Sequence, residues 1–193
     1  MRRGSCGAAS SSTTTLSGVG DRFEVVVDVE TTLGDAPGLA DLVRAWLIAD
    51  DIVDPEPTDD GRYRAKSPGE GRVQLEVGRK VFFPVQGSPG PAACPRCGYP
   101  VVLTDPATGK ATVDWQSFSD ALTEWHNAGS GEVRCVSCAS AVTINEWYWQ
   151  GEWPVAIGNL GITFWNWPRL DTGFVRQIGE RLGHRIVVTR GEL

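Results

Sequence analysis

Two Cys-x-x-Cys pairs constrain the structure that this chain can form more than any other sequence feature. The first pair is Cys94 and Cys97, and the second is Cys135 and Cys138. Each pair places two sulfurs on one tight turn, and two such turns supply the four tetrahedral ligands that zinc prefers. Because four thiolates leave no open coordination position, the motif predicts one structural zinc ion rather than a catalytic one.

Three other interpretations of the four cysteines remain open. A rubredoxin-type iron centre uses similar turns. A redox dithiol usually sits where a helix follows a strand, a context that neither pair has. In the third interpretation, the cysteines are core residues that bind no metal. Clustered cysteines in a reducing compartment favour a metal over disulfides, and the fifth cysteine, Cys6, is expected to be a free thiol without a role.

The residues around the cysteines carry a family resemblance. The segment from Cys94 to Tyr99 (CPRCGY) resembles the first knuckle of the zinc-ribbon family, and the segment from Cys135 to Ala139 (CVSCA) resembles the second. The resemblance covers about residues 92–150 and implies metal binding but no particular function. Two departures stand out: Ala139 occupies a position where the family often has Gly, and a helix is expected to fill the long spacer between the pairs.

Outside this region the sequence predicts a compact α/β body. Hydrophobic periodicity and turn residues indicate strands and helices in alternation. The expected order is a strand over 22–29, a helix with the stripe Leu39, Leu42, Val43, Trp46 and Leu47, strands over 62–66 and 73–77, a strand over 160–167, a helix from the cap Asp171 to Gly183, and a strand over 184–189. This order, βαβ followed by βαβ, is typical of the ferredoxin-like fold.

We therefore predict an α+β, ferredoxin-like two-layer sandwich that carries an inserted zinc-ribbon-like module. The predicted divisions are a disordered tail over 1–18, a main body formed by 19–86 and 156–193, and a zinc-binding insertion over 87–155. Within the insertion, a helix capped by Asp114 and a strand over 141–149 accompany the two knuckles.

The charge and the hydropathy of the chain limit the kinds of partner that it can bind. The net charge of −6 argues against a basic footprint for nucleic acid. No apolar run approaches the roughly 18 residues that a membrane helix needs, so we expect no membrane association. The predicted location is the cytoplasm.

Tryptophan is abundant, with eight residues in the chain. Alternation along a strand places Trp147 and Trp149 on one face, and it places Trp165 and Trp167 on one face opposite Phe164. These residues bury the joint between insertion and body, form an exposed patch that binds a partner, or stack on nucleic-acid bases, an option that the acidic charge disfavours. The residues of the candidate partner-binding patch are Trp147, Trp149, Trp153, Trp165 and Trp167.

The carboxylates and histidines indicate a functional site less strongly than the cysteines do. Asp28 and Glu30 stand at the end of the first strand, where paired carboxylates can bind a divalent metal or move protons, but a solvated turn is the favoured interpretation. His126 falls at the end of an expected helix and His184 stands beside Gly183, which ends another, and a favourable interaction with the helix C-terminus accounts for both. The sequence carries no Gly-rich phosphate loop, nucleophile elbow or metalloprotease helix.

These observations favour a non-catalytic function. We predict a cytosolic, zinc-stabilised protein-interaction module, such as a small regulator, an adaptor or an immunity-type protein, whose partner is another protein. One alternative is a nucleic-acid-associated zinc-ribbon protein that uses Arg96, Lys110 and Arg134. The second alternative is an enzyme with a site near Asp28 and Glu30.

Overall fold

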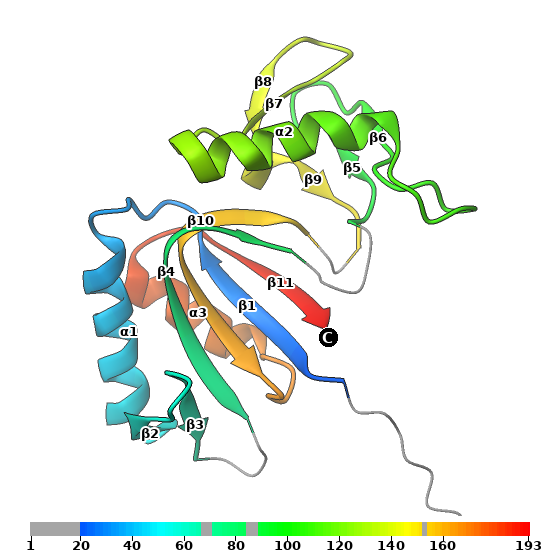
Figure 1. Cartoon of the computed structure of the whole chain (residues 1–193). Coiled ribbons are helices and arrows are strands. Elements are labelled where there is room, and N and C mark those ends of the chain that lie inside the picture. Colours follow the sequence, from blue (N-terminus) through cyan, green and yellow to red (C-terminus); the bar gives the residue numbers. More distant parts are fainter. Residues whose placement is uncertain (1–19, 67–70, 84–88, 152–153) are drawn as a thin grey trace, which may run out of the picture.

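The computed structural model describes residues 20–66, 71–83, 89–151 and 154–193. Its largest element is a six-stranded sheet in which every neighbouring pair of strands is antiparallel (Figure 1). The strand order is β11-β1-β10-β4-β3-β2. The strands are β1 Arg22–Asp28, β2 Val53–Pro57, β3 Tyr63–Ala65, β4 Arg72–Phe82, β10 Ala156–Trp165 and β11 Ile186–Glu192.

Two helices, α1 (Ala36–Ala49) and α3 (Thr172–Leu182), cover one face of this sheet and create the main core. Val26, Val43 and Ile178 are completely buried there, so β1 and both helices meet in one apolar layer. Both ends of α3 follow their sequence signals. Asp171 accepts a hydrogen bond from the Phe174 amide at 2.9 Å and caps α3. Gly183 ends α3 in the left-handed conformation, with φ of 70°.

Two expectations for the body were wrong. Leu42 belongs to the apolar stripe predicted for the first helix, yet it is 46% exposed on α1. Strand β2 is also absent from the strands expected for the body. Because β2 is the edge strand of the sheet, Pro55 and Pro57 do not interrupt a central ladder.

The segment between β4 and β10 contains small elements with a separate hydrophobic core. A three-stranded sheet with the order β6-β5-β9 and a β7-β8 hairpin lie beside one long helix (Figure 1). The elements are β5 Ala92–Ala93, β6 Pro100–Val101, α2 Val113–Ala128, β7 Glu132–Arg134, β8 Ala141–Thr143, a 3-10 turn at Ile144–Glu146, and β9 Tyr148–Trp149. The 3-10 turn divides the single strand predicted over 141–149, and Thr112 replaces Asp114 as the N-cap of α2.

Polar contacts join this segment to the body at the start of β10. The Asn145 side chain donates to the Ile157 carbonyl at 2.8 Å and accepts from the Ile157 amide at 2.9 Å. The Trp125 indole donates to the Lys80 carbonyl at 2.9 Å. Ile157 also belongs to the core of the inserted segment, so the joint is both apolar and hydrogen-bonded.

The sheet face away from α1 and α3 carries its own small cluster of buried side chains. The Phe82 ring lies where a Cβ on Gly161 of the neighbouring strand would be, only 2.3 Å from that position. The ring of Phe23 lies over Gly191 in the same way. These aromatic rings therefore cover part of a face that no helix covers in the part of the chain that the structure describes.

Candidate metal centre

The two Cys-x-x-Cys turns have the same backbone conformation. The Gly98 amide donates to the Cys94 carbonyl at 2.9 Å, and the Ala139 amide donates to the Cys135 carbonyl at 2.9 Å. The residue after the second cysteine is left-handed in both turns, with φ of 73° at Gly98 and 59° at Ala139. Ala139 thus adopts the conformation that glycine adopts more easily, at a cost of about 1 kcal/mol.

The four sulfurs converge into one cluster and fit a tetrahedral ion. All four Sγ atoms lie within 4.8 Å of one another. The Cys97–Cys135 and Cys94–Cys138 Sγ distances are 3.7 and 3.9 Å. An ion about 2.3 Å from each sulfur sets the edges of its tetrahedron near 3.8 Å, whereas a disulfide needs about 2.05 Å. The distances therefore match a metal cage and not a disulfide, and the four cysteines predicted from the sequence can hold one metal ion.

The cluster is anchored in the core of the inserted segment. Cys94 and Cys135 are buried and belong to the same apolar cluster as Phe118 and Trp147. Cys97 and Cys138 are exposed. The Arg96 amide lies 3.4 Å from the Cys94 sulfur and donates to it, as is usual around thiolate ligands. A metal here would join the two knuckles on one side of this small core.

In the absence of an ion, the pKa values of the two exposed thiols, Cys97 and Cys138, are shifted in opposite directions. Hydrogen bonds from Ser140 lower the pKa of Cys138 to about 6. For Cys97 the Tyr99 amide favours the thiolate, but burial and the three neighbouring cysteine sulfurs outweigh it and raise the pKa to about 11. At neutral pH the metal-free cluster therefore holds a proton on Cys97 that an ion must displace.

We expect metal retention to weaken as the pH falls. Binding needs all four thiolates, so protons compete with the ion, and the proton on Cys97 is displaced at any pH below about 11. Below about pH 6 Cys138 also becomes protonated and adds to the competition. Competition with a chromophoric chelator at pH 8, 7 and 5.5 will show a falling apparent affinity. An affinity that is independent of pH would contradict four-thiolate ligation.

The structure places the described tryptophans of the candidate partner-binding patch in different parts of the fold. Trp147 is buried and Trp149 half-buried, and both pack edge-on against Phe118, at ring-centroid distances of 4.8 and 5.7 Å. Their indoles donate to carbonyls of the same segment, at Val142 and Ile144. These two residues thus share a face, as expected, but that face is the core of the inserted segment.

The other tryptophans lie elsewhere. Trp165 packs against Phe23 on the sheet face away from the helices, whereas Trp167 packs against Phe164 in the main core. Trp165 and Trp167 were expected to share a face opposite Phe164. That expectation was wrong for Trp167 because β10 ends at Trp165 and Asn166 turns the chain with a φ of 51°. Trp153 lies outside the described residues.

Asp28 belongs to a buried polar cluster rather than to the solvated turn favoured by the sequence. Its side chain is fully buried and accepts from the Glu30 and Thr31 amides at 3.0 and 2.9 Å. The Thr31 hydroxyl also donates to it. His184 Nδ1 lies 2.8 Å from Asp28 Oδ2 and 3.1 Å from Thr31 Oγ1. No helix-end interaction is needed to place His184, and sequence reasoning did not connect it with Asp28, 156 residues away.

This cluster does not have the geometry of a catalytic triad. Both Asp28 and Thr31 contact the same ring nitrogen of His184, whereas a relay needs the acid on one nitrogen and the nucleophile on the other. Glu30, the second predicted carboxylate, is exposed and accepts from the Arg185 amide at 2.9 Å. Of the two predicted carboxylates, Asp28 is therefore fully buried whereas Glu30 is exposed.

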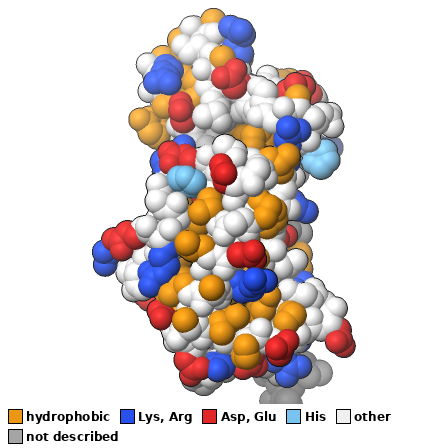
Figure 2. All heavy atoms as spheres, turned by 90° about the vertical axis from the view of Figure 1, so that its left-hand side faces the viewer, with side chains coloured by type: hydrophobic (Ala, Val, Ile, Leu, Met, Phe, Trp, Pro, Cys, Tyr) orange, Lys and Arg blue, Asp and Glu red, His pale blue; other side chains and the backbone are white. Residues whose placement is uncertain are grey.

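The basic residues named for nucleic-acid contact are largely engaged. Arg96 forms an ion pair with Glu146 at 3.3 Å, and Arg134 donates to the Ala139 carbonyl at 2.8 Å. Figure 2 shows acidic and basic side chains interspersed over the face that carries α1, without a large patch of one sign. Neither observation provides the concentrated positive surface that nucleic acid requires.

Comparison with protein-family models, curated proteins and solved structures gave no match. Function must therefore be argued from the geometry of this chain. Among the helices that the structure describes, none has the length and apolar character to cross a lipid bilayer.

Proposed function

We propose that this chain is a cytosolic, non-catalytic protein-interaction module, a small regulator or adaptor, stabilised by one structural zinc ion. Zinc is the proposed ion because closed four-cysteine cages are its usual structural sites. Cys94, Cys97, Cys135 and Cys138 would hold it. Bound zinc would fix the two knuckles in place and would leave no coordination position for a substrate.

The proposal extends to the architecture. Strands β11, β1, β10 and β4 lie in the order fourth, first, third and second of the βαβ-βαβ series, all antiparallel. That order supports a ferredoxin-like body, with β2 and β3 added at one edge. The similar backbone of the two knuckles supports a zinc-ribbon-like module inserted between the halves.

An apolar outer face beside the metal centre carries the functional proposal. In sheet β6-β5-β9, one cross-strand row is Val101, Ala92 and Trp149, and it belongs to the core. Because neighbours along a strand point to opposite faces, the alternate residues point outward. We call these outward residues the outer strip; they are Ala93, Pro100, Val102 and Tyr148.

The outer strip is exposed to an unusual degree for apolar residues. Tyr148 is 63% exposed and Val102 is 44% exposed. Tyrosine is among the residues that most often anchor protein interfaces. Residues 92–150 contain six carboxylates and three basic side chains. The partner expected from this chemistry is therefore a protein with an apolar contact surface surrounded by basic residues.

The test compares two surface variants in affinity capture from the source cells. The double variant Val102→Ser and Tyr148→Ser should lose a stoichiometric partner that the unmodified protein retains. With purified partner, we expect the affinity to fall about tenfold or more, since interface anchors contribute about 2 kcal/mol. The matched control is Leu42→Ser, which removes a similarly exposed apolar side chain on α1. Equal retention by the double variant, or no stoichiometric partner at all, would contradict the proposal.

A further inference from the structure

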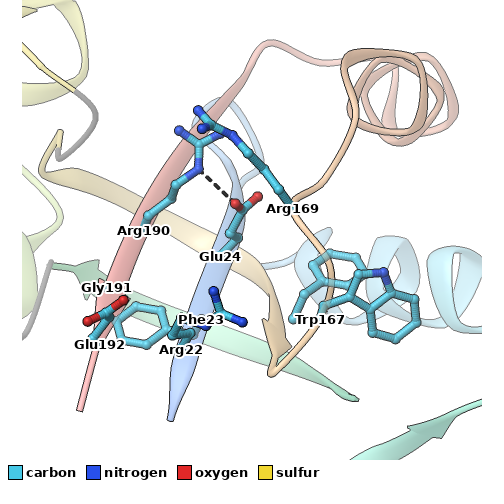
Figure 3. Close-up of a pocket in the computed structure, with 9 residues that line it drawn as sticks. Arg22, Phe23, Glu24, Trp167, Arg169, Arg190, Gly191 and Glu192 are labelled. Atoms are coloured by element: carbon cyan, nitrogen blue, oxygen red, sulfur yellow. Dashed lines mark hydrogen bonds and ion pairs between the residues drawn. The ribbon is translucent and has the colours of Figure 1, made fainter. Parts of the chain in front are cut away.

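The six-stranded sheet has two outer strands, and both carry residues that oppose pairing with another chain. Strand β2, at one edge, contains Pro55 and Pro57. Strand β11, at the other edge, carries Arg190 and Glu192. Figure 3 shows Arg190 Nε donating to the Glu24 carboxylate, at a distance of 2.8 Å. Proline and charged side chains are the usual means by which proteins keep edge strands from pairing. An apolar edge in the same sheet without such residues therefore needs a separate explanation.

Strand β4 has such an edge, because β3 lies beside only one end of it (Figure 1). Strand β4 has eleven residues, but its register with β3 ends at Val73, opposite Tyr63. At the other end of β4, Arg79 donates to the carbonyl of Asn127 in α2 at 3.0 Å. The open part of the edge is therefore limited to residues 74–78, which span about 17 Å at the usual rise per residue.

Two residues of the open part direct their backbone amides and carbonyls away from β10. The Ala65 amide donates to the Gly71 carbonyl at 2.9 Å, so Gly71 faces β3. The hydrogen-bonding direction alternates along an antiparallel strand, and the register of β4 with β10 is unbroken from Arg72 to Val77. Leu75 and Val77 therefore face the same way as Gly71. Among the residues that the structure describes, no backbone group pairs with Leu75 or Val77 on that side.

A cavity of about 330 Å³ lies between α1 and this open edge. Ala40 of α1 lines it, together with Leu75 and Val77 of β4. Val77 is 40% exposed, whereas Leu75, on the same face, packs against the main core. The charged groups in the lining, Asp41 and Arg44, form an ion pair with each other at 3.0 Å. The cavity thus offers apolar space, without net charge, to a side chain that lies along the edge.

The opposite face of the same edge carries an acidic side chain. Glu76 follows Leu75 and therefore points to the sheet face away from α1. Its carboxylate accepts from Thr163 Oγ1 at 2.9 Å, and it forms no ion pair with any residue that the structure describes, Arg79 and Lys80 included. In an added strand, a basic residue opposite Glu76 would lie within reach of this carboxylate.

We propose that the open edge of β4 binds an extended segment of a partner protein, which adds to the sheet as an antiparallel strand. The free amides and carbonyls of Leu75 and Val77 bond to its backbone. The cavity accepts its apolar side chains at two alternate positions, and Glu76 pairs with a basic residue between them. The occupant is thus an apolar–basic–apolar segment. This edge belongs to the body, whereas the outer strip belongs to the inserted segment, so the two proposals are independent.

The backbone contacts are tested with a blocked, fluorescein-labelled peptide of sequence Thr-Val-Lys-Val-Thr, titrated with the full chain and followed by fluorescence anisotropy. We expect saturable binding. N-methylation of both valines removes the amide donors that face β4 in an antiparallel pair, so this peptide should not bind. N-methylation of the lysine alone changes an amide that faces away, so this peptide should still bind. Equal binding of the two methylated peptides, or no binding of the unmodified peptide at millimolar concentrations, would overturn the proposal.

The side-chain contacts are tested by one change in the peptide and one in the protein. A peptide with glutamate in place of lysine should bind about fivefold more weakly, because like charges directly opposite each other on a sheet repel. The variant Val77→Lys places a charge on the cavity side of the edge and should weaken binding of the original peptide about tenfold or more. Val77 is 40% exposed, so this variant should fold normally. Equal binding of the two peptides would contradict the role of Glu76 and overturn the proposed occupant.

The matched control is Leu42→Lys, which adds the same charge at a similarly exposed apolar residue of α1. Its affinity for the peptide should stay unchanged, and a loss equal to that of Val77→Lys would show that only the overall charge matters. Sedimentation equilibrium should give the same mass for the unmodified chain and for Val77→Lys. A dimer that Val77→Lys dissociates would assign the edge to a second copy of this chain and would also overturn the proposal.

Discussion

We expect that removing a metal ion from the four-cysteine site will unfold the inserted segment and leave the six-stranded sheet folded. The inserted segment has only a small core, around Phe118 and Trp147, and its strands are two or three residues long. Zinc binding to thiolates contributes about 10 kcal/mol or more in isolated zinc modules, which is comparable with the whole stability of a typical domain. Little of this segment is expected to persist without it.

Cys97→Ser tests this expectation without placing a hydroxyl in the core, because Cys97 is exposed. The near-UV circular dichroism of the variant should lose the contribution of Trp147 and Trp149, whose rings are fixed against Phe118. Treatment of the unmodified protein with a strong chelator should give the same spectrum. The control is Cys6→Ser, which should retain metal and signal. A complete near-UV signal after full metal removal would contradict a structural role for the ion.

Hydrogen exchange separates the two parts of the chain in the same samples. Amides of β1, which lies between β10 and β11 in the large sheet, should stay protected after metal removal. Amides of the β7-β8 hairpin should exchange rapidly. The body is expected to survive because its apolar cluster, which includes Val26, Val43 and Ile178, contains no cysteine. Global loss of protection would show that the two parts fold as one cooperative unit.

The sequence predicted the features that depend on local patterns. Two Cys-x-x-Cys turns predicted a cluster of four sulfurs that could hold a metal ion, because the spacing itself sets the geometry of the sulfurs. The Asp171 cap and the Gly183 stop located the last helix, since both act within one turn. The order of strands and helices in the body followed from periodicity except for β2, which was missed, and the bounds of the other elements shifted by several residues.

Features that depend on contacts between distant residues were not predictable in this way. A single left-handed residue, Asn166, moved Trp167 to the opposite side from Trp165, and nothing in the alternating pattern signals that turn. The strand expected over 141–149 is broken at Ile144, where the chain enters a 3-10 turn. The register of β1 with β11, which joins residues about 170 positions apart, is likewise not signalled by any local pattern.

Asp28→Ala will be among the most destabilising single substitutions in the body. The Asp28 carboxylate accepts from two backbone amides, from the Thr31 hydroxyl and from His184. Removing it leaves these donors without their acceptor in a site that is fully buried, and each buried unsatisfied group costs about 1–3 kcal/mol. We expect a loss of about 3 kcal/mol or more in the free energy of unfolding, measured by urea denaturation.

Glu30→Ala provides the matched control for Asp28→Ala. Glu30 lies two residues further along the chain and is exposed, and its carboxylate contacts the amide and the guanidinium of Arg185. Exposed pairs of this kind contribute at most about 1 kcal/mol. Equal losses in the two variants would mean that the buried hydrogen bonds of Asp28 contribute nothing beyond an ordinary surface contact.

Asp28→Asn then separates a structural role from a catalytic one. Asparagine keeps an oxygen for the Glu30 and Thr31 amides, so this variant should recover much of the stability that Asp28→Ala loses. A structural role predicts that partner binding, measured on folded protein, is the same in Asp28→Asn as in the unmodified chain. If an enzymatic activity were found and it disappeared in folded Asp28→Asn, the cluster with His184 would have to be reconsidered as an active site.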